Sequence, residues 1–146
     1  MLNWVEPVVV LLGGGVLSLK LLAVWSHTRC TAHGVVDGKL APNNLSPNSV
    51  CSEGETANIA PLAAEQVNSW ENLQDAVQSL LGRFIVTEAN YLHAVFRTPV
   101  LGFEEDFEAR YDNEANCIHL RSASRVGFSD MGSNAKRVES LKRLVE

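Results

Sequence analysis

Cysteines are few in this sequence and basic residues are outnumbered by acidic ones, and both shortages exclude classes of function. The three cysteines, Cys30, Cys51 and Cys117, form no C-x-x-C pair, so we expect no metal site built on them. The 12 Lys and Arg residues against 17 Asp and Glu give a formal net charge of −5. Nucleic-acid binding requires a basic surface, so no nucleic-acid partner is predicted.

Complete catalytic motifs are also missing from the loop that follows residue 125. Gly127 and Gly132 have the glycine spacing of a phosphate-binding loop, but Ser133-Asn134 stands where that motif requires Lys followed by Ser or Thr. The nucleophile elbow G-x-S-x-G is incomplete as well, because Met131 replaces its second glycine. The sequence therefore predicts no catalytic residue, cofactor or metal ligand in this loop.

Two interpretations of this loop stay open. A hydrolase could use Ser129 and Asp130 together with His93 or His119 from elsewhere in the chain. The simpler interpretation is a turn in which Asp130 or Ser133 caps a final helix.

An apolar run, residues 8–25, stands near the start of the chain. Counted from Leu2, the run reaches the roughly 20 residues that a membrane-spanning helix needs. Trp4 and Trp25 lie near its two ends, where indole rings prefer the headgroup boundary. We expect an uncleaved transmembrane anchor over residues 1–26.

A cleaved signal peptide is the rival interpretation, but no Lys or Arg precedes the run and no A-x-A site follows it promptly. A buried helix of a soluble domain would have a polar side, whereas this run is apolar on every side. Lys20, Arg29 and Lys39 lie toward the end of the run or beyond it. By charge bias alone, they would place the C-terminal domain in the cytoplasm.

The rest of the chain divides into an extended linker, residues 27–60, and a globular domain, residues 61–146. Prolines, glycines, Asn and Ser in the linker are incompatible with long regular structure. Helical spacing of apolar residues predicts helices over 63–81, ending before Gly82, and over 133–145. Between them, period-two alternation predicts strands over 83–89, 90–98, 103–111 and 117–125. The predicted fold class is α+β: an N-terminal transmembrane helix, then a small domain with a four-stranded antiparallel sheet covered by two helices.

One face of this sheet is expected to be charged. A register that pairs Tyr111 with Ile118 keeps the apolar faces aligned, and it sets Glu108 opposite Arg121 and Glu104 opposite Arg125. The face is either a solvated surface held by such pairs or a polar binding groove covered by residues 27–60. The candidate residues of an anion site are His93, Arg97, His119, Arg121, Arg125 and Ser129, with Arg97 and Arg125 favoured as arginines without acidic partners.

Several segments resemble the domain of unknown function 1499 family: GVVDGKLAP and LSPNSV within residues 34–50, IAPL at 59–62, TEANYLHAVFRT at 87–98, FEARYD at 107–112 and IHLRSASRVGFSDMGSNAKRVE at 118–139. The resemblance covers about residues 34–145. Family members occur in bacteria and photosynthetic eukaryotes, commonly behind a signal or anchor segment, and the resemblance carries no established activity. It favours a periplasmic or lumenal domain.

The resemblance has one departure. Members often have two cysteines that could pair, and here Asn43 and Ser49 take those places, with Cys51 two residues further on. The family-type disulfide therefore cannot form. Pairing of Cys30 with Cys51 stays open.

These patterns favour a non-enzymatic, membrane-anchored domain that is an accessory or interaction subunit of a larger membrane complex. Its expected partners are membrane lipid and other membrane-protein subunits. One alternative is a binding module for an anionic lipid or metabolite on the charged sheet face, and the other is the hydrolase that uses Ser129. The expected location is a single-pass membrane position, with the domain on the periplasmic or lumenal side in preference to the cytoplasm.

Overall fold

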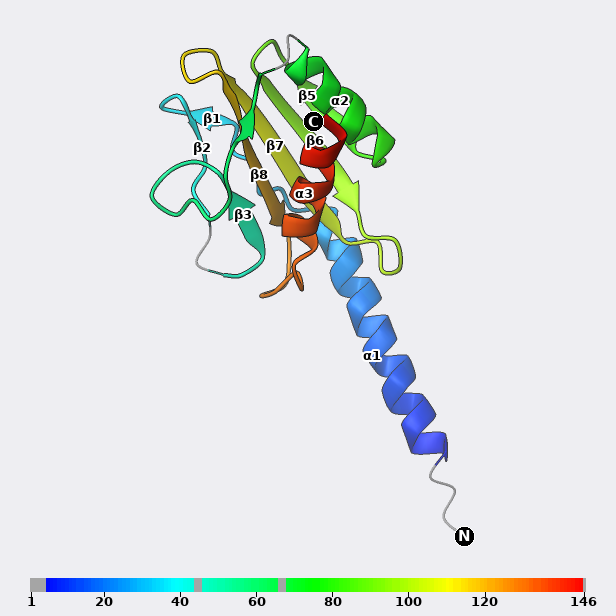
Figure 1. Ribbon diagram of the computed structural model, residues 1–146. Coiled ribbons are helices and arrows are strands. Elements are labelled where there is room, and N and C mark those ends of the chain that lie inside the picture. Colours follow the sequence, from blue (N-terminus) through cyan, green and yellow to red (C-terminus); the bar gives the residue numbers. More distant parts are fainter. Residues whose placement is uncertain (1–4, 44–45, 66–67, 146) are drawn as a thin grey trace.

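The computed structural model of the protein describes residues 5–43, 46–65 and 68–145, and within 5–13 it describes the helical backbone without the side chains. The described residues form three helices and a six-stranded antiparallel sheet, so the α+β class is confirmed (Figure 1). The helices are α1 (Val5–Ser26), α2 (Ser69–Ser79) and α3 (Ser133–Val145). α2 therefore begins later than the predicted residue 63.

The four predicted strands are all present and lie side by side in sequence order. They are β5 (Arg83–Thr87), β6 (Tyr91–Arg97), β7 (Glu104–Asp112) and β8 (Cys117–Ser124). The sheet also has two short strands that were not predicted, β3 (Ser49–Cys51) and β4 (Leu62–Ala63), and both pair with β8. A separate hairpin joins β1 (Val35–Val36) to β2 (Lys39–Leu40). Strands of two or three residues are too short to show alternation in the sequence, and part of the predicted linker therefore belongs to the sheet.

The predicted register of the central hairpin is confirmed. Tyr111 pairs with Ile118, and Glu108 lies opposite Arg121. One face of the sheet consequently carries apolar side chains, which pack against α2 and α3 in a single core. The fully buried core members include Leu73, Val77, Leu92, Phe107, Ile118, Leu120 and Leu141. Apolar spacing in α3 favours Val138, Leu141, Leu144 and Val145 on one side of the helix, but Leu144 is 54% exposed.

α1 projects away from the domain, and its last turn belongs to the fold (Figure 1). Ala23 and Ser26 are buried, and the Ser26 hydroxyl accepts a hydrogen bond of 2.9 Å from the backbone amide of Glu104. The His27 ring lies 3.0 Å from the carbonyl oxygen of Gly102. These contacts fix the end of α1 against the start of β7.

Within the described part of the chain, no helix combines the length and the apolar character that crossing a membrane requires. The predicted span starts at Leu2. Residues 1–4 lie outside the described residues, as do the side chains of 5–13.

Candidate functional site

The face of the sheet opposite the helices carries the expected charges, but the chain covers it. Residues 27–40 cross this face, where the backbone amides of Thr31 and Gly34 donate hydrogen bonds to Asp106 and Glu108. The charged face is therefore not the solvated surface of the first interpretation, because its carboxylates are buried beneath part of the 27–60 segment. We call the covered set the charged network, and its members are His93, Glu104, Asp106, Glu108, Arg121 and Arg125.

Asp106 is the centre of the charged network, and its side chain is inaccessible to solvent. Arg125 donates to both carboxylate oxygens, at 3.0 and 2.7 Å, and His93 Nε2 lies 2.8 Å from Oδ1. The amide and hydroxyl of Thr31 add bonds of 2.7 and 2.9 Å to Oδ2. Burial alone would raise the pKa of Asp106, but the hydrogen bonds from His93 and Arg125 outweigh it and hold the pKa well below its ordinary value.

Glu108 and Arg121 form a second buried pair, 2.9 Å apart and almost without solvent contact. The other oxygen of Glu108 accepts from the Tyr91 hydroxyl and from the backbone amide of Gly34, each at 2.9 Å. Burial and the neighbouring Glu108 carboxylate raise the pKa of Tyr91. The two charges therefore neutralise each other, while Arg121 Nε is buried without a hydrogen-bond partner among the described residues.

The expectation that Arg97 and Arg125 lack acidic partners is wrong, and for Arg125 it conflicts with the predicted register, whose placement of Glu104 opposite Arg125 is confirmed. Arg125 lies 2.6 Å from Glu104 in addition to its contacts with Asp106, and Arg97 lies 3.0 Å from the same glutamate. Arg97 is the outermost of these groups, with 60% of its side chain exposed. An incoming anion would have to displace a carboxylate from Arg125, which uses all three guanidinium nitrogens on Asp106 and Glu104. In the exposed Arg97, one nitrogen contacts Glu104.

The structure places His119 apart from the charged network. Its Nδ1 is 3.3 Å from the Ser52 hydroxyl, and its Nε2 is 3.8 Å from Glu53. Arg110 binds Glu53 at 2.6 Å and Asp112 at 3.0 Å. The six candidate residues therefore divide between the charged network, this second cluster, the exposed Arg97 and the loop that holds Ser129, and they do not form one anion site.

Cys30, His93 and Asp106 hold potential metal-ligand atoms within 4.8 Å of one another. The guanidinium of Arg125 contacts both oxygens of Asp106, however, and a metal ion there would meet its positive charge at short range. His93 Nε2 is already hydrogen-bonded to Asp106. These residues fit a hydrogen-bonded ion-pair network better than a metal centre.

The loop from Gly127 to Gly132 closes the start of α3. The Asp130 carboxylate accepts from the backbone amides of Gly132 and Asn134, each at 2.9 Å, so Asp130 is the capping residue of the two that were considered. The Ser129 hydroxyl accepts a bond of 3.3 Å from the amide of Met131. Within the described residues, no histidine is among the hydrogen-bond partners of Ser129 or Asp130, so the hydrolase arrangement is not assembled.

All three cysteines are free, so Cys30 and Cys51 do not pair in this structure. A hydrogen-bonded link joins the segments that hold Asn43 and Ser49. The Asn58 side-chain oxygen accepts from the Asn43 side chain at 2.8 Å and from the Cys51 amide at 2.9 Å. The Asn58 amide nitrogen donates to the Ser49 carbonyl at 3.4 Å.

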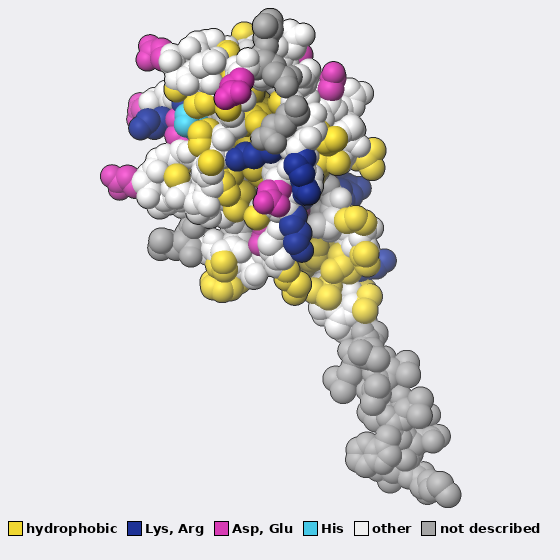
Figure 2. Space-filling model, in the orientation of Figure 1, with side chains coloured by type: hydrophobic (Ala, Val, Ile, Leu, Met, Phe, Trp, Pro, Cys, Tyr) yellow, Lys and Arg dark blue, Asp and Glu magenta, His cyan; other side chains and the backbone are white. Residues whose placement is uncertain are grey.

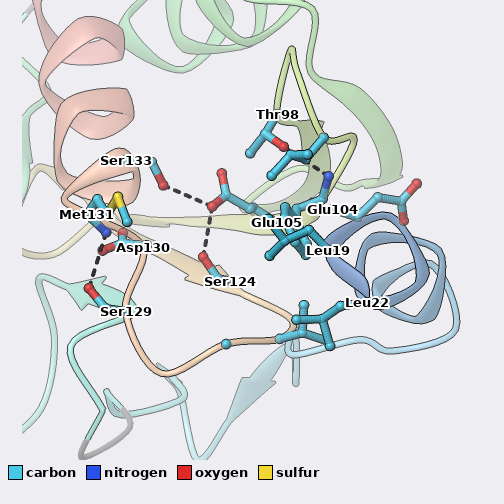
Figure 3. Close-up of a pocket in the computed structure, with 14 residues that line it drawn as sticks. Leu19, Leu22, Thr98, Glu104, Glu105, Ser124, Ser129, Asp130, Met131 and Ser133 are labelled. Carbon is cyan, nitrogen blue, oxygen red and sulfur yellow. Dashed lines mark hydrogen bonds between the residues drawn. The ribbon is translucent and has the colours of Figure 1, made fainter. Parts of the chain in front are cut away.

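An apolar cavity of about 380 Å³ lies where α1 meets the domain (Figure 3). Three segments that are distant in the sequence supply its apolar walls: Leu19 and Leu22 of α1, Leu101 and Phe103 before β7, and Val126 and Met131 after β8. Apolar side chains also gather on the surface of the domain near the point where α1 leaves it (Figure 2). Sequence analysis missed this site because none of the three segments has a motif of its own.

Comparison with known proteins identifies the family of this chain. No curated protein matches the chain. Residues 39–144 match the model of the family described as "Protein of unknown function (DUF1499)". This match covers more than half of the 146 residues, and the chain therefore belongs to the DUF1499 family.

Proposed function

We propose that this protein is a membrane-anchored, non-enzymatic domain that is an accessory or interaction subunit of a larger membrane complex. The observation that carries the proposal is the attachment of α1. The apolar helix ends inside the domain, where buried Ser26 and the Glu104 amide are hydrogen-bonded at 2.9 Å. A helix attached in this way presents the domain to the membrane in one orientation.

The partners of the polar side chains support a non-enzymatic role. A catalytic acid, base or nucleophile needs to reach a substrate, whereas the carboxylates and arginines of the charged network are buried against one another. Ser129 contacts no general base among the described residues. An anion-binding role for the charged face meets the same difficulty, because Arg121 and Arg125 are already paired.

Purification in a mild detergent tests the role as a subunit. The full chain, carrying an affinity tag after residue 146, is extracted from its native membrane, and its partners are identified by mass spectrometry. We expect a second membrane protein in a fixed ratio to this chain. Recovery of the chain alone, at several detergent strengths and after cross-linking in the intact membrane, would contradict the proposal.

The proposed location is a single-pass membrane position with the domain on the periplasmic or lumenal side. Cys30 suits a test of this side because it is exposed and close to the end of α1, whereas Cys51 is buried and less suited to labelling. A membrane-impermeant maleimide applied to intact cells or sealed vesicles should modify Cys30 when the domain lies outside the cytoplasm. The Cys30→Ser variant is the control, and modification only after the membrane is opened would place the domain on the other side.

A further inference from the structure

We propose that the apolar cavity between α1 and the domain holds an acyl chain of a bilayer lipid. This inference rests on the proposed membrane anchoring and adds a ligand site to it. The cavity volume of about 380 Å³ lies within the range of small-molecule pockets. Its apolar walls come from α1, from the loop before β7 and from the loop after β8 (Figure 3).

The polar groups that border the cavity already have hydrogen-bond partners within the protein. Glu105 accepts hydrogen bonds from the Ser124 and Ser133 hydroxyls, at 2.8 and 2.9 Å, and pairs with Arg137. The Thr98 hydroxyl accepts from the Phe103 amide at 2.9 Å.

The two other carboxylates that border the cavity are occupied as well. Asp130 is held by the backbone amides at the start of α3, and Glu104 by Arg125. A polar ligand would find few free partners in this cavity, so the chemistry favours an apolar ligand.

The surroundings of the cavity show which apolar ligand it suits. The loops that form two of its walls carry Val100, Phe128 and Met131, which are 87%, 75% and 92% exposed. These loops lie at the end of the domain from which α1 projects, beside the helix (Figure 1). Exposed apolar side chains gathered at one end of a domain are typical of a surface that contacts lipid or another protein.

Lipid is the occupant that the geometry favours, because the third wall of the cavity is α1 itself. Leu19 and Leu22 line the cavity, and the apolar sequence of α1 extends from them toward the N-terminus. An acyl chain that lies along an apolar helix of this kind would reach the cavity without leaving apolar surface.

Photolabelling tests the site on the full chain. The protein is reconstituted into phosphatidylcholine vesicles that contain a phosphatidylcholine with a diazirine in its acyl chain, and adducts are mapped by mass spectrometry after illumination. We expect adducts on residues 98–103 and 126–133 in addition to α1. Adducts confined to α1 would overturn the lipid site and leave the anchoring intact, whereas failure of the chain to float with the vesicles would overturn the anchoring itself.

A cavity-filling variant separates entry into the cavity from contact at the surface. Leu101→Trp places a larger side chain in the wall, so we expect loss of adducts on 126–133 while those on α1 persist. Leu144→Trp is the control, because Leu144 is a 54% exposed residue near the C-terminal end of α3. Unchanged labelling of 126–133 in Leu101→Trp would overturn the proposal, as would a cross-link in native membranes that shows another protein in the cavity.

Discussion

Arg125 binds both oxygens of the Asp106 carboxylate, with nitrogen–oxygen distances of 3.0 and 2.7 Å. Thr31, which lies in the segment after α1, donates its backbone amide to the same carboxylate. The pair therefore joins three parts of the protein: the first half of β7, the loop after β8 and the residues that follow α1. Two-point contacts of this kind are among the strongest side-chain interactions in proteins. The charged face of the sheet consequently acts as a second, polar interior.

Acid should weaken the fold through Asp106. The pKa of this carboxyl is lower in the folded protein than its ordinary value of 3.8, so the unfolded chain takes up the proton first as the pH falls. The stabilisation is complete above about pH 4 and is lost as the pH drops toward the folded-state pKa. Asp106→Asn removes the titrating group, so its free energy of unfolding should be lower at neutral pH and change less between pH 5 and pH 2.

Thermal unfolding across this pH range checks the acid prediction. Asp112 and Asp130 also have lowered pKa values, so some pH dependence should persist in the variant. Identical pH slopes for the Asp106→Asn variant and the original protein would show that Asp106 does not contribute.

Replacing Arg121 should destabilise the protein far more than replacing Arg97. Arg121→Met keeps much of the side-chain volume but leaves the buried Glu108 without its partner, and breaking a buried pair in this way costs about 3–5 kcal/mol. Arg97→Met removes a pair whose arginine side chain is 60% exposed, which should cost at most about 1 kcal/mol. Denaturant unfolding of both variants measures the difference, and equal losses would show that burial does not govern these pairs.

Two neighbouring residues of the loop before α3 should differ in their effect on stability. Asp130→Ala removes the carboxylate that accepts from the Gly132 and Asn134 amides, and loss of a cap costs about 0.5–2 kcal/mol. Ser129→Ala removes only one exposed hydrogen bond, of 3.3 Å, to Met131, and its melting temperature should stay close to that of the original protein. A large loss in Ser129→Ala would contradict this account of the loop.

Gly82 is needed for close packing. A Cβ atom at this position would lie 2.6 Å from Val77 Cγ1 and 2.8 Å from Phe96 Cζ, so Gly82→Ala should destabilise the protein by about 1–3 kcal/mol. Gly15→Ala is the control, because its added Cβ has open space and its φ is not positive. Equal unfolding curves for Gly82→Ala and the original protein would contradict the steric account.

Leu81, rather than Gly82, takes the left-handed conformation after α2. Its φ is +63°, which costs an L-residue roughly 1–2 kcal/mol, and its side chain is 87% exposed. Leu81→Gly should therefore raise the stability by about 0.5–1 kcal/mol, because the lost strain exceeds the added freedom of the unfolded chain. A higher melting temperature confirms this, and a fall would indicate that the Leu81 side chain makes stabilising contacts.

Alternation in the sequence was enough to predict the central strands and their register. Phe107 and Ala109 are apolar while Glu108 is charged, and a shift of one residue would bring the wrong side chains to the helices. Alternation did not predict the burial of Glu105, a charged residue that lies among the apolar residues of the helix-covered face. Its partner, Arg137, comes from α3. The sequence of the strand alone does not predict a partner from another element.

The covering of the charged face could be expected only in outline. Its hydrogen-bond donors include the backbone amides of Thr31 and Gly34, and every residue except proline has such an amide. The amino-acid types of residues 27–40 therefore do not predict which carboxylates this segment contacts. The same limit applies to the apolar cavity, whose walls come from three separated segments.

The hydrogen bonds of Ser26, Thr31 and Gly34 bear on where a stable fragment of the protein should begin. All three residues precede the family match, which begins at residue 39. A fragment that starts there would keep every strand of the six-stranded sheet. It would lose the donors to Asp106 and Glu108 and the acceptor for the Glu104 amide. A fragment that begins at the last turn of α1 should therefore be more stable than one that begins at residue 39, where the family match begins.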